Sequence, residues 1–420
     1  MTHIDESQIY GTLTDDGGEA SAQEARNGLR HMTSLSMTKV ADGLLSPKLV
    51  LAWIMSAIGA PAVLVSFLVP IREAGALLPQ VLLAGVVEAR RHRKWVWVAG
   101  SVGQGISAAA IALFALTLEG WIGGIAICAA LAVLACSRAA CSVSYKDILG
   151  KTVAKTRRGA VKGVAGSASS AAVLIFALLL LSGYLQEITP LAVAVGVAAV
   201  LWLVAAVTFS TLEEKASDPD PEKAGSIDWT PLREDAQFRR FIAARGALTA
   251  TALAPPYLVL LDGGEGQLQK LGALLLASAA AAFVSSYVWG RMSDRSSRRV
   301  LILGGIGGAL SMLAAVGADL AGWTAALWVT PVILFLMQIA YQGVRQGRST
   351  YLVDMAPEDS RSTYAALANT AIGLLLLASG LFGGLLSAAG PLWALAGFAA
   401  LSLVGALIAR GLDEVETEAD

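Results

Sequence analysis

Most of this chain consists of charge-poor segments of about twenty residues, which is the length that an α-helix needs to cross the hydrocarbon core of a bilayer. One stretch, residues 363–409, contains no Asp, Glu, Lys or Arg at all. Over the whole chain 55% of the residues are hydrophobic and only 15% are charged, whereas soluble domains carry about 25% charged residues. We therefore expect an all-α membrane protein.

The charge-poor segments predict about twelve transmembrane helices in two groups of six. The first six are placed at residues 49–69, 72–89, 95–117, 121–142, 163–184 and 189–211. The second six are placed at residues 241–261, 270–290, 299–319, 324–344, 364–386 and 390–410. Residues 70–73 are interpreted as a tight turn between the first two helices, and Gly390-Pro391 as the break between the last two, because proline does not continue a helix.

Polar segments set the domain boundaries. Residues 1–44 contain no apolar run, so we expect a mostly disordered cytoplasmic tail there. Residues 212–237 are rich in Asp, Glu and Lys and are interpreted as a cytoplasmic linker. These segments leave an N-terminal six-helix bundle at residues 45–211, a C-terminal six-helix bundle at 238–411, and a short cytoplasmic tail at 412–420.

The positive charges between the predicted helices alternate from side to side. One side carries Arg90, Arg91, Arg93 and Lys94, then Lys151 to Lys162, the flanks of the linker, and Arg291 to Arg299. The other side offers only Arg72 and Lys270. Loops rich in Lys and Arg stay in the cytoplasm, so we expect both termini and the linker there. The expected location is a bacterial inner (plasma) membrane, with the lipid bilayer around a multi-pass chain.

A motif follows the eighth predicted helix and has a weaker copy after the second. In the C-terminal half it consists of Gly290, Asp294, Arg295, Arg298 and Arg299. This spacing resembles the cytoplasmic signature of the major facilitator superfamily: glycine, three residues, Asp-Arg, two residues, and paired basic residues. In the N-terminal copy Gly85 keeps its place, Ala89 replaces the aspartate, and Glu88 lies one residue early. Asp147 and Asp354, which follow the fourth and tenth helices, resemble acidic positions of the same family.

The resemblance covers residues 45–410 and implies a fold, a mode of action and a set of gating residues. The implied fold is two six-helix bundles with a solute site between them near the middle of the membrane. The implied activity is secondary active transport of a small organic solute by alternating access, by a monomer that needs no cofactor. The implied gating residues are Gly290, Asp294, Arg295, Arg298, Gly85, Glu88, Asp147 and Asp354. Of these, Asp294 would hold a helix start and Arg298 in the outward-facing state.

The resemblance also implies that the first, fourth, seventh and tenth helices face the solute cavity. Polar candidates for its lining are Trp53, Arg138, Arg245, Gln338, Tyr341, Gln342, Arg345 and, on the eleventh helix, Asn369. A charge inside the membrane costs about 2.5–3.5 kcal/mol on insertion scales, so such residues are functional candidates. If the arginines face the cavity, the substrate is expected to be anionic. The alternative is that they reach the cytoplasmic surface and only anchor their helices.

The sequence offers fewer candidates for proton coupling. No carboxylate lies in the middle of a predicted helix, and the nearest is Glu73, at the predicted outer edge of the second helix beside Arg72. Glu73 is therefore the candidate proton-binding group, with an interfacial ion pair as the alternative. The main reason to expect proton coupling is that transporters of the superfamily that the chain resembles commonly use it. Facilitated diffusion is the alternative.

Other classes of protein fit less well. No spacing of His and Cys indicates a metal site, and no nucleophile lies within a recognisable acid–base set, so we expect no enzyme. The net charge of −1 gives no basis for nucleic-acid binding. Two alternatives remain open: a multidrug or metabolite efflux antiporter, and a sensor or scaffold that keeps a transporter fold without transport.

Overall fold

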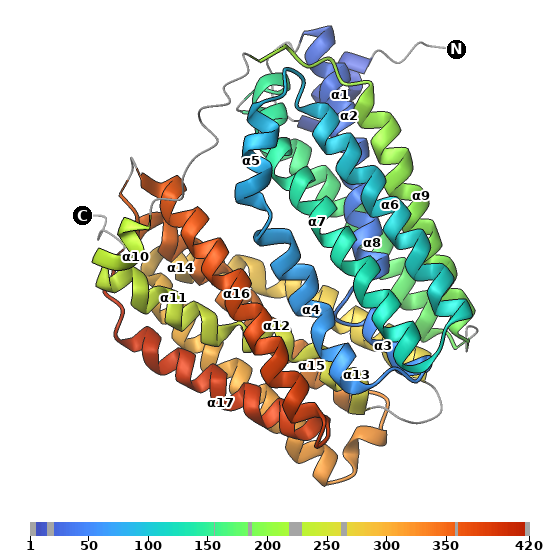
Figure 1. The fold of residues 1–420 in the computed structure, drawn as a ribbon, viewed down its shortest axis with the longest axis vertical. Coiled ribbons are helices and arrows are strands. Elements are labelled where there is room, and N and C mark those ends of the chain that lie inside the picture. The colour runs from blue at the N-terminus through green and yellow to red at the C-terminus, as the bar shows by residue number, and fades with distance from the viewer. Residues whose placement is uncertain are drawn as a thin grey trace.

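The computed structural model describes residues 6–14, 21–154, 156–183, 187–217, 229–261, 267–357 and 360–415. Over these residues the chain is helical and contains no strand. Nine of the described helices are long and apolar enough to cross a membrane by their length and composition. The helices form two groups, one from each half of the sequence (Figure 1). The two groups lie farther apart on the side of the molecule where the chain termini lie.

The N-terminal half consists of six membrane-length rods preceded by the short helix α1 (Glu6–Thr14). The first two rods are each interrupted, and the other four are continuous. The helices are α2 (Ala22–Leu45), α3 (Val50–Ala57), α4 (Ala62–Leu77), α5 (Gln80–Glu88), α6 (Lys94–Thr117), α7 (Gly120–Thr152), α8 (Arg158–Leu181) and α9 (Ile188–Ser210).

The first two rods differ from the prediction. Residues 22–45 form an ordered helix that continues through α3 as one candidate span, Ala22–Ala57, so the expected disordered tail is wrong over this range. The turn between the first two rods lies at residues 58–61, where Gly59 has a φ of 70°, and not at residues 70–73. Residues 70–73 lie inside α4. The first rod therefore begins at Ala22 and not at residue 49, and it ends at Ala57 and not at residue 69. The second rod begins at Ala62 and not at residue 72, and it ends at Glu88, close to the predicted end.

The physical reason for this error is that the polar residues of α2 face the bundle and are paired there. His31 is buried and its Nε2 lies 2.8 Å from Thr152 Oγ1 of α7. The Asn27 side chain donates to the Glu213 carbonyl at 3.1 Å, and its oxygen accepts from the Glu213 backbone N–H at 3.0 Å. These partners lie just at or beyond the ends of α7 and α9, so the first part of α2 packs polar side chains at the basic end. Further along α2, Asp42 is paired with Arg72 and Arg138 inside the bundle, and a polar group that is satisfied inside the protein is compatible with a helix that crosses a membrane.

The C-terminal half also forms six rods. Its helices are α10 (Thr230–Glu234), α11 (Ala236–Leu248), α12 (Ala250–Leu253), α13 (Pro255–Leu261), α14 (Gln267–Leu320), η2 (Trp323–Ala325), α15 (Val329–Met355), α16 (Arg361–Ser387) and α17 (Pro391–Arg410). Helix α14 comprises two rods that meet at Ser296, whose backbone is extended. Helices α11 to α13 together form one rod. Twelve rods in two groups of six confirm the predicted major facilitator fold.

The two halves contact each other near one end of the rods. Helix α4 packs on α16, α8 on α14, and α3 on α13. Glycines allow close approach at two of these contacts: a Cβ on Gly380 would lie 2.4 Å from Pro70, and one on Gly272 would lie 2.5 Å from the Leu181 nitrogen. Ser66 and Ser387 share a hydrogen bond of 3.2 Å across the same interface. We call this end of the molecule the closed end.

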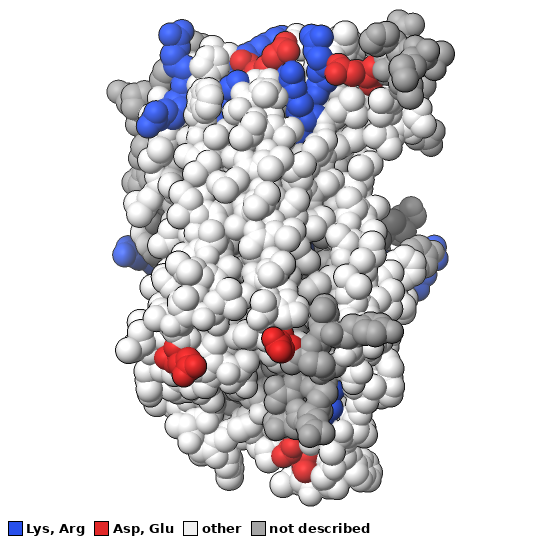
Figure 2. Space-filling model, turned by 90° about the vertical axis from the view of Figure 1, so that its right-hand side faces the viewer, with Lys and Arg blue, Asp and Glu red and all other residues white. Residues whose placement is uncertain are grey.

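At the opposite end the halves are apart (Figure 1). The rods of the N-terminal half carry Arg90, Arg91, Arg93, Lys94 and Lys151 there, and we call it the basic end. One face of the molecule shows Lys and Arg gathered at one end above a broad uncharged belt (Figure 2). An uncharged belt is what lipid requires, so the charge distribution agrees with a membrane-spanning arrangement of the rods.

Candidate functional site

A cavity of about 760 Å³ lies between the two halves. Its lining comes from α2, the break after α2, α4, α7 and α8 on one side and from α14 and α15 on the other. Two smaller cavities, of about 170 and 650 Å³, continue from it along α15 and share Arg345 and Arg348 with it. The described lining of the largest cavity holds five cationic side chains, Lys48, Arg72, Arg138, Arg345 and Arg348, and two carboxylates, Asp42 and Glu73.

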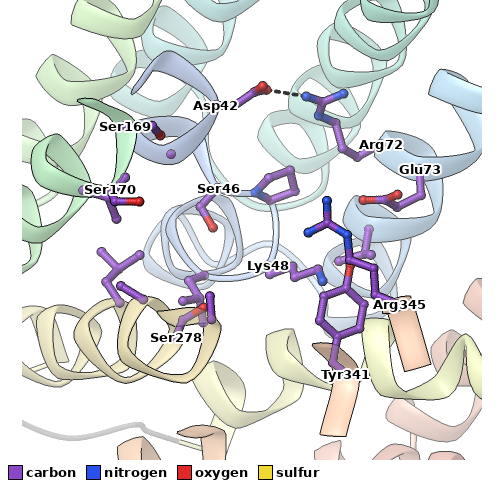
Figure 3. Close-up of a pocket in the computed structure, with 18 of the residues that line it drawn as sticks. Asp42, Ser46, Lys48, Arg72, Glu73, Ser169, Ser170, Ser278, Tyr341 and Arg345 are labelled. Atoms are coloured by element: carbon purple, nitrogen blue, oxygen red, sulfur yellow. Dashed lines mark hydrogen bonds and ion pairs between the residues drawn. The ribbon is translucent and has the colours of Figure 1, made fainter. Parts of the chain in front are cut away.

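Asp42 of α2 connects three helices inside the N-terminal bundle. One carboxylate oxygen accepts a hydrogen bond from Arg72 of α4 at 2.5 Å (Figure 3), and the other accepts one from Arg138 of α7. The Arg72 side chain is only 9% exposed, whereas that of Arg138 is 35% exposed, towards the cavity. Arg138 was predicted to line the cavity, and it does, but its charge is already matched by Asp42.

Lys48 reaches across the cavity to the other half. It lies in the break between α2 and α3, just after Pro47, where the helix cannot continue. Its Nζ lies 3.7 Å from the centre of the Tyr341 ring on α15. An ammonium group over an aromatic face is a favourable cation–π contact. The predicted cavity residue Tyr341 therefore lines the cavity together with Lys48 (Figure 3).

Three arginines of the C-terminal half line the same connected space. Arg245 is 7% exposed, and its Nη2 donates to Asn369 Oδ1 at 3.4 Å, while its Nε has no partner among the described residues. Arg345 and Arg348 lie one turn apart on α15 and line all three cavities. Within the described part of the chain no carboxylate forms an ion pair with any of these arginines. This part of the cavity therefore carries excess positive charge.

Glu73 of α4 faces this excess charge. It lines the largest cavity and also the 170 Å³ cavity, where Arg245, Arg345 and Arg348 are its cationic neighbours. Among the described residues it is in no ion pair shorter than 4 Å. Glu73 was expected at the outer edge of the second helix. It lies instead in the middle of the second rod, so its interpretation as a cap at a helix start is wrong.

The remaining predicted cavity residues divide into two groups. Gln342 and Asn369 line the 650 Å³ cavity. Trp53 is 8% exposed within the hydrophobic core and lines none of the cavities described above. Gln338 is buried and donates to Ser278 of α14 at 3.1 Å. Trp53 and Gln338 therefore pack and connect helices, although their polar groups suggested a lining role.

The predicted gating residues lie at the basic end. Asp147 pairs with Arg93 at 2.8 Å and with Lys151. Arg298 pairs with Glu414 at 2.9 Å and donates to the Leu412 carbonyl at 3.0 Å. Gly85 and Gly290 are half-buried in helices, while Arg295 and Asp354 are exposed. The side chains of Glu88 and Asp294 lie outside the described residues.

Asp42, Lys48 and Arg72 were not predicted as cavity residues. Asp42 was assigned to the tail, Lys48 to the residues just before the first helix and Arg72 to a turn, because the first helix was placed too late. One signal was available: Gly59-Ala60-Pro61 is a stronger turn sequence than Pro70-Ile71-Arg72, since glycine supplies the positive φ that a tight turn uses. Placing the first turn there brings Asp42 and Glu73 to mid-membrane.

Comparisons with known proteins agree with this geometry. Residues 247–420 match the sequence model of the Major Facilitator Superfamily. The C-terminal half of the chain is therefore similar in sequence to this superfamily. No curated protein sequence matches it significantly.

Solved structures extend the likeness in fold to both halves of the chain. A mutant form of the nucleoside transporter NupG superposes with a TM-score of 0.68 at 12% identity, covering 92% of this chain and all of that one. A POT family transporter in complex with 5-aminolevulinic acid gives 0.67 at 12% identity and covers 91% and 95%. The inward-open xylose transporter XylE from E. coli gives 0.66 at 12% identity and covers 93% and 97%. At this identity the likeness concerns the fold, which is that of membrane transporters.

Proposed function

We propose that this protein is a secondary active transporter that moves a small organic anion by alternating access. The observation that carries the proposal is the charge of the central cavity, in which five cationic side chains face two carboxylates. Arg345 is exposed and Arg348 is half-buried at the cavity, and neither has a carboxylate partner among the described residues. Their guanidinium groups are therefore available to an anionic ligand, which would supply the missing negative charge.

The proposed binding site is the C-terminal side of the cavity together with Lys48. Arg138 and Arg72 already share Asp42, so they offer less to a ligand. Arg345, Arg348 and Arg245 present guanidinium donors, and such donors bind carboxylates and phosphates in a bidentate manner. Asn369, Gln342 and Tyr341 add neutral polar groups that can recognise the rest of the solute.

Proton coupling is proposed to run through Glu73. This carboxylate lies beside the cavity arginines and has no described ion pair. A bound anion and a negatively charged Glu73 would compete for the same cationic side chains, Arg345 and Arg348, so a proton on Glu73 would accompany the bound anion. Anion and proton would then bind together and cross the membrane in the same direction, which is symport.

We further propose an orientation with both termini in the cytoplasm of a bacterium and a monomer in the inner membrane. The basic end would then face the cytoplasm, as the positive-inside rule requires. With the halves in contact at the closed end, the structure would be the inward-facing state. The gating segment around Asp294 and Arg298 would lie at the cytoplasmic rim, where Arg298 holds residues 412–414 and can release them when the rim closes.

A thermal-stability screen of the purified protein against solutes sorted by charge tests the proposal. A ligand present at 100 times its dissociation constant should stabilise the folded state by roughly 2.7 kcal/mol. Anions with a carboxylate or phosphate group should raise the melting temperature, while matched neutral and cationic analogues should not. Stabilisation by lipophilic cations or neutral drugs alone would contradict the proposal and favour drug efflux. An efflux antiporter that accepts anions would still meet the binding test and would differ in the direction of transport.

A further inference from the structure

The largest cavity has two chemically different walls (Figure 3). One wall carries Lys48, Glu73, Tyr341 and Arg345. The opposite wall is formed by α8 and α14, and its described lining residues are uncharged: Ser169, Ser170, Val173, Leu275, Ser278, Ala279, Ala282 and Phe283. A volume of about 760 Å³ is in the range of pockets that enclose drug-sized ligands. A compact anion bound at the charged wall would leave the uncharged wall without an occupant.

The serines of the uncharged wall already have hydrogen-bond partners. Ser169 donates to the Lys39 carbonyl at 2.9 Å, and Ser170 donates to the Gly166 carbonyl at 3.1 Å. Ser278 accepts from Gln338 at 3.1 Å. These hydroxyl groups therefore need no ligand, and what the wall mainly offers to a ligand is small and apolar surface.

The uncharged wall lies where α8 and α14 separate. At the closed end the two helices touch, because Gly272 of α14 approaches the backbone of Ala177 and Leu181 of α8. Towards the basic end the cavity lies between Ser170 on α8 and Phe283 on α14. Phe283 lines the cavity and is also 85% exposed. The cavity therefore opens between these two helices to the outer surface of the protein.

This opening lies at the depth of the lipid tails. Gly272 and Phe283 are eleven residues apart on α14, which corresponds to about 16 Å along a helix. Since the hydrocarbon core is about 30 Å thick and α14 begins at the closed end, Phe283 lies near mid-membrane. The neighbouring side chain Val284 is 54% exposed and apolar, as a lipid-facing residue should be. A molecule passing between α8 and α14 would therefore enter from the bilayer.

We infer that the substrate is a single-chain amphiphilic anion, whose charged group binds at Lys48 and Arg345 while its acyl chain lies between α8 and α14. This inference rests on the proposed function, because it uses the same cationic site. It adds the chemical class of the substrate and a lateral route of entry. The charge of the head group and the small apolar wall are both required, so neither a short anion nor an uncharged chain satisfies the whole cavity.

The test is a binding series in lipid nanodiscs with three probes: dodecanoate, butyrate and dodecanol. Radiolabelled dodecanoate is measured by scintillation proximity, empty nanodiscs correct for partition into lipid, and the other two probes compete. Each methylene that leaves water adds about fourfold in affinity. Dodecanoate should therefore bind at least ~60-fold more tightly than butyrate if three of its added methylenes contact the uncharged wall. Dodecanol should compete poorly.

Two filling variants and one control locate the acyl chain of the ligand. Ala282→Trp fills the opening and should weaken dodecanoate binding at least tenfold while leaving butyrate binding unchanged. Val284→Trp places the same bulk two residues later on the exposed face of α14, away from the lining, and is the matched control that should behave like the wild type. Ala279→Phe provides a second filling variant should Ala282→Trp fold poorly.

Two results would overturn the inference. Equal affinities for butyrate and dodecanoate, with no effect of Ala282→Trp or Ala279→Phe, would remove the lateral chain site and leave the anion transporter intact. Competition by dodecanol as strong as that of dodecanoate, with no binding of butyrate, would show that charge is not recognised. That second result would remove the proposed function as well.

Discussion

Lys48 of the N-terminal half and Tyr341 of the C-terminal half are in direct contact across the central cavity, with the ammonium nitrogen 3.7 Å from the ring centre. Lys48 lies at a break in the first rod, after Pro47, and Tyr341 lies one turn before Arg345 on α15. A change of state that separates the halves must break this contact, and an anion bound between them would take over the charge of Lys48.

The Lys48 contact leads to a prediction on affinity. Lys48→Met keeps an apolar side chain on Tyr341 but removes the cation, so the affinity for the transported anion should fall about tenfold, as for loss of one charged hydrogen bond. Lys162→Met, on an exposed position of α8, is the matched control. Titration of the purified variants with the best anion from the charge-sorted screen measures the effect. An unchanged affinity in Lys48→Met would exclude Lys48 from the site.

The Asp42 ion pairs lead to a prediction on stability. Asp42→Asn leaves Arg72, whose side chain is 9% exposed, without its described carboxylate partner. Removing one partner of a buried ion pair costs about 3–5 kcal/mol. The variant should therefore unfold at a lower temperature than the wild type in the same detergent.

A second substitution separates pairing from packing at Asp42. Arg72→Met in the Asp42→Asn background removes the orphaned charge and should recover part of the stability, which a double-mutant cycle measures. If the double variant is no more stable than Asp42→Asn alone, the ion pair is not the reason for the loss.

Glu73 is the subject of a prediction on coupling. Glu73→Gln resembles the protonated carboxyl group but cannot release a proton, so anion binding should persist without coupled proton uptake. Proteoliposomes of this variant should exchange anion across the membrane but should not accumulate it when a proton gradient is applied. Glu187→Gln, at an exposed position before α9, should retain both activities. Accumulation by Glu73→Gln at the wild-type level would exclude Glu73 as the coupling group.

The closed end provides a prediction on conformation. A side chain on Gly380 would meet Pro70 of α4 at 2.4 Å, so Gly380→Leu should separate α4 from α16 and favour opening of the closed end. Gly196→Leu is a control, because no atom lies within 4 Å of its added Cβ.

The readout for this prediction is a cysteine placed at Ser66, which is 5% exposed at that interface, in a background without the three native cysteines. Gly380→Leu should raise its rate of maleimide labelling several-fold, whereas Gly196→Leu should not. Equal labelling in the two variants would mean that the contact between α4 and α16 does not keep the closed end shut.

The sequence predicted the fold, and it named several residues that line the cavities on the C-terminal side: Arg245, Tyr341, Arg345 and Asn369. The charge-poor segments locate ten of the twelve rods, although α7 ends at Thr152 and not at residue 142. Helix α15 extends to Met355, eleven residues beyond the predicted end, because its charged residues face the cavity and do not meet lipid.

The N-terminal side could not be predicted in the same way. Hydropathy measures whether a segment is apolar, whereas α2 carries polar groups that are paired inside the bundle, such as Asp42 with Arg72 and Arg138. Pairing partners that lie far apart in the sequence leave no local signal. For the same reason, that Asp42 neutralises Arg138 follows only from the three-dimensional arrangement.

The most direct test of the anion site is equilibrium binding of the best anion to a variant with both Arg345→Gln and Arg348→Gln. Each charged hydrogen bond contributes about 1.5–3 kcal/mol, so the double variant should bind at least ~100-fold more weakly than the wild type. Arg410→Gln, on the exposed end of α17, should bind like the wild type. Wild-type affinity in the double variant would contradict the account, because the excess charge of Arg345 and Arg348 would then have no part in holding the substrate.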